Sequence, residues 1–181
     1  DIYVCRSASP DPERRRNILL INNGDNTFSD KARDYNLDDA SYSTQAAFFD
    51  FDRDTDLDVI LLNHSTLDIS NSFLINLRNS TTRYPNVGNK LLANENGKFI
   101  DVSDSLRVFG PASNYGLGIS LSDVNNDGWI DIYTGCDYTG RDKLLFNNDG
   151  RYFIDTTNSL SHISKFTMGT DIADFNGDGW M

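Results

Sequence analysis

The chain contains three copies of a short aspartate-rich segment, and this repeat constrains its fold more than any other feature. The copies occupy residues 50–58, 123–131 and 174–180, and each follows a short apolar run. In the two complete copies, oxygen-bearing side chains stand at positions 1, 3, 5 and 9 of a nine-residue loop. Oxygen ligands at alternate positions of a tight loop are those that Ca²⁺ prefers. The spacing therefore predicts one Ca²⁺ ion in each loop.

The expected ligands come from the odd-numbered loop positions, with position 7 offering a backbone carbonyl. They are Asp50, Asp52, Asp54, Asp56 and Asp58 in the first loop, Asp123, Asn125, Asp127, Trp129 and Asp131 in the second, and Asp174, Asn176, Asp178 and Trp180 in the third. Position 6 must turn sharply, which suits glycine. Gly128 and Gly179 hold it, but the first loop has Thr55, which we expect to be strained by roughly 1–2 kcal/mol. Asp56 adds a carboxylate there, so we still expect an ion in that loop.

A second module precedes each loop. It begins with Asn/Asp-x-Leu-Leu-x-Asn at residues 17–22, 89–94 and 142–147, and continues through a turn rich in Asn, Asp and Gly. A short run containing Phe28, Phe99 or Phe153 then follows. Two short apolar runs joined by such a turn predict a β-hairpin. We expect these phenylalanines, and the rings of Trp129 and Trp180, to pack between neighbouring repeat units.

One repeat unit reads as four short strands with the aspartate loop between the first two. The predicted strands are 44–49, 57–63, 90–94 and 98–102 in one unit, and 116–122, 130–135, 143–146 and 151–155 in the next. No segment has a convincing helical period, and residues 29–35 read as a short turn at most. Four strands in a period of about 40–50 residues are typical of propeller blades. The predicted fold is an all-β β-propeller of four-stranded antiparallel blades.

We expect residues 1–181 to form about three blades of a larger propeller. The predicted divisions are 1–49 for a partial blade that runs into the next first strand, 44–102 for a blade with an insertion at 65–88, 116–155 for the following blade, and 167–181 for the start of another. Asp1 reads as position 9 of a further loop, and the third loop stops at Met181, before its own position 9. We therefore expect the sequence to be a fragment, and ion binding in its third loop is left open.

The combination of motifs resembles a known family of repeats. Asn-x-Leu-Leu-x-Asn-Asn-Gly, then Phe-x-Asp, then Asp-x-Asn-x-Asp-Gly-x-x-Asp is similar to FG-GAP/VCBS repeats, the calcium-binding blades of integrin α-like propellers. Residues 11–24 and 43–52 resemble exported VCBS-repeat proteins of Bacteroidota, which often carry an ASPIC/UnbV domain. The resemblance covers essentially the whole chain. It implies a Gram-negative cell-surface or outer-membrane location, with a lipid anchor on an upstream N-terminus as one arrangement, but it implies no particular activity.

Charge and composition exclude several classes of protein. The chain has 27 acidic and 16 basic residues, for a net charge of −11, and much of the negative charge stands in the loops. We expect no nucleic-acid partner, because that needs a basic face. No apolar run approaches about 18 residues, so we expect no membrane span. Arg14, Arg15 and Arg16 read as a solvated connector, and Cys5 and Cys136 as unbridged thiols.

Evidence for catalysis in the sequence is thin. No nucleophile elbow or phosphate-binding loop is present. Alternating strand direction places several rings and cations on the face opposite the aspartate loops, where they could bind a sugar or an anion, or serve as ordinary loop residues. The main candidates are His64, Tyr84, Tyr115, Tyr138, Arg141 and His162, with Arg78, Arg83 and Lys165 nearby.

Three functions follow from these observations. The leading one is a non-catalytic, calcium-binding propeller that acts as an exported cell-surface module for binding a glycan or a protein, or as a subunit of an outer-membrane complex. The alternative is a calcium-dependent carbohydrate-active enzyme, a lyase or hydrolase, on the same scaffold. A third is a purely structural role in supporting another domain.

Overall fold

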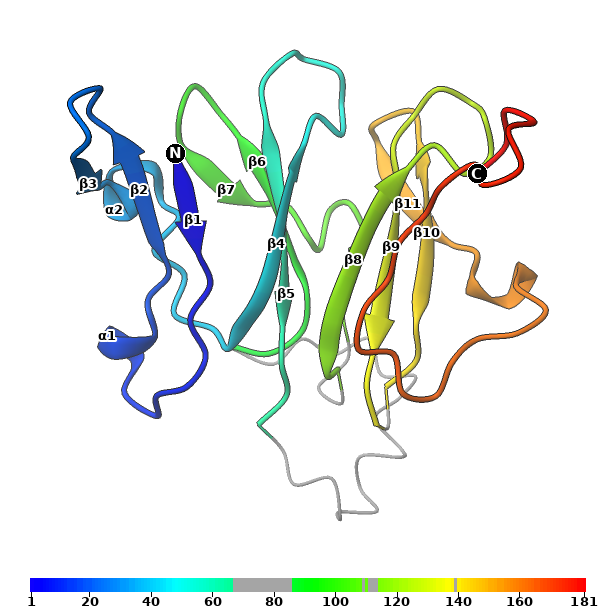
Figure 1. Cartoon of the computed structure of the whole chain (residues 1–181), viewed down its shortest axis with the longest axis horizontal. Coiled ribbons are helices and arrows are strands. Elements are labelled where there is room, and N and C mark those ends of the chain that lie inside the picture. Colours follow the sequence, from blue (N-terminus) through cyan, green and yellow to red (C-terminus); the bar gives the residue numbers. More distant parts are fainter. Residues whose placement is uncertain (67–85, 109, 111–113, 139) are drawn as a thin grey trace.

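The computed structural model describes residues 1–66, 86–108, 110, 114–138 and 140–181. These residues form three antiparallel sheets that follow one another along the chain and stand side by side (Figure 1). Each sheet is one repeat unit, folded as a meander in which sequential strands are neighbours. The predicted all-β class is confirmed, and the arrangement is that of a partial β-propeller.

The strands agree with the predicted ones to within two residues at each end. The first sheet contains β1 (Ile2–Val4), β2 (Ile18–Asn22) and β3 (Phe28–Asp30). The second contains β4 (Ser43–Phe49), β5 (Asp58–Asn63), β6 (Lys90–Asn94) and β7 (Phe99–Asp101). The third contains β8 (Gly116–Ser122), β9 (Asp131–Cys136), β10 (Lys143–Asn148) and β11 (Tyr152–Asp155).

Helices are limited to single turns in the connections. They are α1 (Pro12–Arg15), α2 (Ala32–Tyr35) and the 3₁₀ turn η1 (Thr157–Ser159). Helix α2 is capped at its C-terminus by Asn36, which adopts φ +61° and donates its N–H to the Ala32 and Arg33 carbonyls. No helix among the described residues is both long and apolar enough to cross a membrane.

The core lies between the sheets, and the middle sheet supplies both of its halves. All six residues of β5 are buried. Val59 and Leu61 belong to the cluster shared with the first sheet, whereas Ile60 and Leu62 belong to the cluster shared with the third. Alternate side chains of a strand point to opposite faces, so this near-continuous apolar run is what a sheet covered on both sides requires.

The repeated phenylalanines pack between sheets where a preceding sheet is present. Phe153 packs against Phe51 of the preceding unit's aspartate loop, with ring centroids 6.4 Å apart, and Phe99 shares a core cluster with Leu19 and Leu37 of the first unit. These two predictions are confirmed. Phe28 is 45% exposed, because the described residues place no sheet on its side of β3.

The arginine run next to α1 is not simply a solvated connector. Arg15 is only 2% exposed, and its guanidinium donates to the Ala40 and Ser9 carbonyls at 2.6 and 2.7 Å. It also stacks over the Tyr42 ring at 3.9 Å. The prediction was wrong for this residue, since the guanidinium binds carbonyls of the β1–β2 and β3–β4 connections. Arg14 is exposed, as expected.

A buried polar position recurs just before β2, β6 and β10, the second-to-last strand of each sheet. Asn17, Asn89 and Asp142 occupy it, and all three are buried. Asn17 donates to Ser43 Oγ of the next sheet at 2.9 Å, and Asp142 accepts from the Cys136 N–H at 2.8 Å. Buried polar groups need such partners. This position therefore ties each sheet to its connections.

The two cysteines, Cys5 and Cys136, form no disulfide, as predicted.

Candidate cation-binding loops

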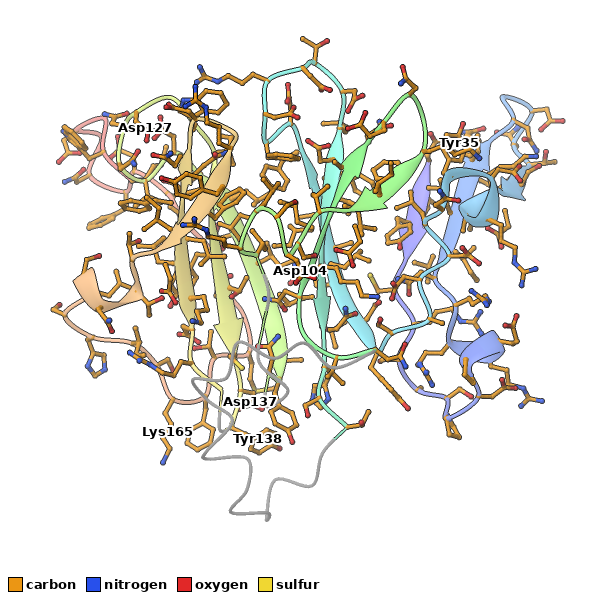
Figure 2. The ribbon with its side chains drawn as sticks, turned by 180° about the vertical axis from the view of Figure 1, so that it is seen from behind. Tyr35, Asp104, Asp127, Asp137, Tyr138 and Lys165 are labelled. Atoms are coloured by element: carbon orange, nitrogen blue, oxygen red, sulfur yellow. The ribbon has the colours of Figure 1, made fainter. Side chains whose placement is uncertain are left out.

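The aspartate loops gather at one end of the molecule. The first joins β4 to β5 and the second joins β8 to β9, both at the upper end in Figure 1, and the third lies beside them near the C-terminus. Asp127 of the second loop marks this end in Figure 2, whereas Asp137, Tyr138 and Lys165 lie at the opposite end. The predicted separation of the two faces is confirmed.

All three loops fold on the same internal hydrogen bonds. The N–H of position 6 donates to the carboxylate of position 1, and the N–H of position 7 donates to the side chain of position 5. The first bond is 3.1 Å from Thr55 to Asp50, 2.7 Å from Gly128 to Asp123, and 2.7 Å from Gly179 to Asp174. The second bond is 3.0, 2.8 and 3.0 Å long in the three loops. The repeated spacing in the sequence is therefore a repeated backbone geometry.

The turn at position 6 has positive φ in every loop, as the sequence predicted. The angles are +79° at Thr55, +89° at Gly128 and +88° at Gly179. An L residue with a branched Cβ is strained in this region, whereas glycine is not. Thr55 is thus held in an unfavourable conformation by the rest of the first loop.

Position 9 closes each complete loop with a buried carboxylate. Asp58 is 2% exposed and accepts the Phe51 and Asn94 N–H groups at 3.1 and 2.9 Å. Asp131 is 1% exposed and accepts the Val124 and Asn147 N–H groups, both at 2.9 Å. Each aspartate therefore joins the start of its loop to the third strand of its sheet.

Asp1 occupies the same place in the first sheet. Its Oδ1 accepts the Asn22 N–H at 2.9 Å, as Asp58 and Asp131 do from the corresponding asparagines. Structurally, Asp1 is therefore equivalent to position 9 of a loop.

Burial and mutual repulsion raise the pKa of several loop carboxyls. Burial, reinforced by the charges of Asp52 and Asp56, raises the pKa of Asp58 to about 6. The pKa values of Asp52 and Asp131 are raised as well, again chiefly by burial. Backbone hydrogen bonds lower the pKa of Asp174 instead. Without a counter-charge, the two complete loops therefore disfavour their own ionised form.

The first loop brings its carboxylates closest together. Oxygen atoms of Asp50, Asp52 and Asp58 lie within 4.8 Å of one another, the one such group of three acidic, histidine or cysteine side chains in the described part of the chain. Asp56 Oδ1 is buried without a hydrogen-bond partner. An unsatisfied buried oxygen is costly, and a bound cation would satisfy it. These donors therefore fit a hard divalent ion such as Ca²⁺.

The second and third loops replace one carboxylate by an amide. Asn125 Nδ2 donates to Asp127 Oδ2 at 2.8 Å, and Asn176 Nδ2 donates to Asp178 Oδ2 at 2.9 Å. The amide supplies a donor that Asp52, at the same position of the first loop, lacks. These loops thus satisfy part of their negative charge internally.

One contact between loops was not predicted. Arg53, at position 4 of the first loop, donates through Nη2 to the Gly128 carbonyl of the second loop. Its guanidinium lies 4.2 Å from the centre of the Trp129 ring. The only signal in the sequence was a basic residue among aspartates. The expected packing of Trp129 between units is confirmed, whereas Trp180 is exposed.

The opposite face assembles some of the predicted ligand-binding residues. The His64 and Tyr115 rings lie 4.7 Å apart, and the Tyr115 and Tyr138 rings 5.6 Å apart. The row continues to Phe166, which sequence reasoning missed, at 6.3 Å from Tyr138. Tyr115 is only 3% exposed, so Tyr138 and Phe166 present the accessible rings.

Two other candidates that the structure describes lie outside this row. Arg141 is exposed and donates to Asn158 Oδ1 at 3.4 Å, and His162 is exposed in the connection after η1. Tyr84, with Arg78 and Arg83, lies outside the described residues. Of the five predicted residues that it describes, the structure therefore brings together His64, Tyr115 and Tyr138.

A further hollow lies between the first and second sheets. It has a volume of about 610 Å³ and is lined mainly by apolar side chains, among them Tyr3, Leu37, Phe48 and Phe99. No sequence motif predicted this hollow, because it depends on how two sheets face each other.

The sheets and their loops define a class of protein, the β-propeller built from repeats that carry an aspartate loop between the first two strands. Comparison with known families agrees with this description. A family model described as FG-GAP-like repeat matches residues 1–61 and 123–181. The chain belongs to the FG-GAP-like repeat family. A comparison with curated proteins gave no match.

Proposed function

We propose that the protein is a non-catalytic, calcium-stabilised propeller module that is exported and serves at the cell surface to bind a ligand or to assemble with other proteins. The observation that carries the proposal is the hydrogen-bonded backbone that the three loops share, which in the first loop accompanies carboxylate oxygens of Asp50, Asp52 and Asp58 within 4.8 Å of one another. In the first loop this arrangement leaves one buried carboxylate oxygen, Asp56 Oδ1, without a partner.

The donor set favours Ca²⁺ over other common ions. Each loop offers only oxygen donors, and each complete loop offers more of them than a tetrahedral site uses. Zn²⁺ prefers nitrogen and sulfur ligands, and Mg²⁺ demands a compact octahedron with several waters. An irregular loop with many carboxylates suits the larger and more flexible coordination of Ca²⁺.

The ion would stabilise the blade by joining two strands. Position 1 stands at the end of the first strand and position 9 begins the second, so one cation bound to Asp50 and Asp58 would hold β4 and β5 together. Its charge would also relieve the repulsion that raises the pKa of Asp58. Because the unfolded chain lacks this geometry, binding adds directly to the stability of the fold.

Export and a cell-surface role rest on the resemblance to exported repeat proteins and on calcium supply. Exposed loops of this kind bind Ca²⁺ weakly, at the 10⁻⁴–10⁻³ M typical of extracellular modules. Such sites fill outside the cell, where calcium is abundant. For the partner we propose a glycan or a subunit of an outer-membrane complex.

The row of rings opposite the loops is the surface we propose for that partner. Tyr138 and Phe166 expose aromatic faces there, with Lys165 adjacent to Phe166. Aromatic rings stack on sugars, and neighbouring polar groups fix their orientation. The alternative of a carbohydrate-active enzyme stays a prediction from the sequence.

Thermal unfolding with calcium, magnesium or a chelator tests the core of the proposal. We expect calcium to raise the midpoint, with a gain of about 2.7 kcal/mol in the free energy of unfolding when calcium is at 100 times Kd. Magnesium at the same concentration should do much less. Equal midpoints in calcium and in chelator would exclude the cation-binding role.

The surface role needs a separate measurement. Binding to a glycan array, with wild type compared with Tyr138→Ala in calcium, should show loss of binding in the variant. Turnover of a bound polysaccharide, abolished by changes on the same face, would replace the binding role with the enzymatic alternative.

A further inference from the structure

The first two loops touch through a single long side chain. Arg53 leaves position 4 of the first loop, spans to the adjacent sheet, and donates to the Gly128 carbonyl while stacking on Trp129. Gly128 and Trp129 are positions 6 and 7 of the second loop. In this family of loops position 7 is the one expected to offer its backbone carbonyl to the ion. Arg53 therefore holds the part of the second loop nearest its expected ligand.

The junction is close enough to transmit a change in position. A Cβ on Gly128 would lie 2.6 Å from Arg53 Nη2, so a larger residue there would displace the guanidinium from this contact. A Cβ on Gly150, in the β10–β11 turn, would lie 3.0 Å from the Asp52 Cα and 3.1 Å from the Trp129 ring. Closely packed groups of this kind do not deform continuously.

The first loop in turn fixes the start of this side chain. The Arg53 N–H donates to Asp50 Oδ1 at 2.6 Å, and Arg53 adopts φ +65°, in the left-handed region. Asp50 is a ligand of the proposed ion in the first loop. A bound cation would order Asp50, and with it the backbone from which the guanidinium extends.

We propose that Arg53 is a positioning residue of the neighbouring loop, so that the loops 50–58 and 123–131 bind their cations as a coupled pair. The inference rests on the cation-binding role proposed above and adds its regulation. When the first loop is filled, Arg53 is already ordered, and the second loop forms its site with less loss of conformational freedom. Coupling of this kind is reciprocal, so filling the second loop must also tighten the first.

The charge of Arg53 requires its side chain to extend away from the proposed cation site of the first loop. A guanidinium inside a cation-binding loop would repel the ion. Directed onto the Trp129 face and the Gly128 carbonyl, it is held by a cation–π contact and a hydrogen bond instead. A lysine could keep the charge but not the planar stack.

Calcium titrations of variants measure the coupling. The background is the full chain with Asp174→Ala and Trp180→Phe, which disables the third loop and leaves Trp129 as the sole tryptophan. Calorimetry should give two sites in this background. Disabling the first loop with Asp52→Ala should weaken calcium binding by the second about fivefold, the lower range of typical coupling.

Arg53→Ala separates the coupling from the sites themselves. It should keep two sites, weaken the second about fivefold, and add no further loss when combined with Asp52→Ala. Arg53→Lys should recover only part of the affinity. The matched control is Arg107→Ala, because Arg107 also has positive φ, at +62°, and stacks on a third-sheet ring, Tyr152, at 4.4 Å, but lies outside the loops. Arg107→Ala should leave calcium binding unchanged.

Tryptophan fluorescence gives a readout that a general loss of stability would not mimic. With the second loop disabled by Asp123→Ala, calcium should still change the Trp129 emission through Arg53, and Arg53→Ala should abolish that change. Two sites with the same affinities in the Asp174→Ala, Trp180→Phe background with and without Arg53→Ala would overturn the coupling and leave the cation-binding role intact. Absence of any calcium binding would overturn both.

Discussion

The loops at 50–58 and 123–131 have the same backbone frame and different side chains within it. Both close on a buried aspartate at position 9, and both turn through positive φ at position 6. The first loop places threonine at the turn and carboxylates at every odd position, whereas the second has glycine and one amide. The shared backbone therefore sets where the oxygens stand, while the side chains decide how far each loop depends on a cation.

The second loop can relieve its own charge in a way that the first cannot. Asn125 donates to Asp127, so one carboxylate has an internal partner. In the first loop Asp52 has no hydrogen to donate, and Asp56 Oδ1 is left unpartnered. We therefore expect the first loop to gain more from calcium, although its threonine makes it the less regular copy in the sequence.

The largest expected effect tests what the loops share. Asp58→Ala removes the acceptor of two backbone N–H groups, and should lower the free energy of unfolding by about 3 kcal/mol. Asp131→Ala should cost about the same, because it accepts an equivalent pair. Chemical denaturation measures both. A loss below about 1 kcal/mol in either would show that position 9 does not close that loop.

Dependence on pH should separate calcium-bound from calcium-free protein. The pKa of Asp58 in the fold, about 6, lies above its ordinary value of 3.8, so the fold favours the protonated carboxyl. In chelator, this group's contribution to stability is present at low pH and is lost as pH rises through 6. Calcium needs the ionised form, so the stabilisation by calcium should shrink as pH falls from 7 to 5.

Melting curves at the two pH values, each with and without calcium, check this sign. Asp58→Asn is the control, since its amide cannot titrate and should remove most of the pH dependence of the calcium effect. An unchanged calcium increment between pH 7 and pH 5 in wild type would contradict the assignment of Asp58 as a ligand.

Exchanging the turn residues should reverse the difference in backbone strain between the two loops at position 6. Thr55→Gly relieves a branched residue at φ +79° and should raise the free energy of unfolding by about 1 kcal/mol. Gly128→Ala should act in the opposite direction, because a Cβ there is both strained and in contact with Arg53. Measurements in chelator isolate the backbone effect from cation binding. Destabilisation by Thr55→Gly would mean that the threonine side chain makes a compensating contact.

The smallest expected effect comes from making the second loop resemble the first. Asn125→Asp removes the amide donor to Asp127 and adds a negative charge. In chelator it should lower the free energy of unfolding by about 0.5–1 kcal/mol. In calcium it should instead tighten binding by the second loop. Calorimetry that showed weaker binding would contradict the view that the amide substitutes for part of the ion's role.

Much of the fold was predictable because its information is local. The hairpin motif and the loop spacing repeat, so strand ends followed to within two residues. The positive φ of Thr55 followed from its alignment with Gly128 and Gly179. Candidate ligands could be named for the same reason, as positions in a loop whose geometry depends on its own hydrogen bonds.

The rest depended on contacts between units. Arg15 is buried because carbonyls of the connections converge on it, and Arg53 reaches Trp129 because two sheets stand side by side. Tyr115 was predicted to lie on the face opposite the aspartate loops as a ligand-binding residue, yet the neighbouring rings of His64 and Tyr138 cover it. No pattern within one repeat encodes which residue of the next repeat it will meet, so these features needed the structure.

The burial of β5 on both faces also has a consequence for cooperativity. Val59 and Leu61 contribute to one side of the middle sheet and Ile60 and Leu62 to the other. Opening the backbone of this strand to solvent would expose both clusters at once, so its amide hydrogens should exchange only when all three sheets separate. The outer strands β3 and β11 can fray one sheet at a time. We therefore expect β5 to be the last of the described strands to exchange its amide hydrogens.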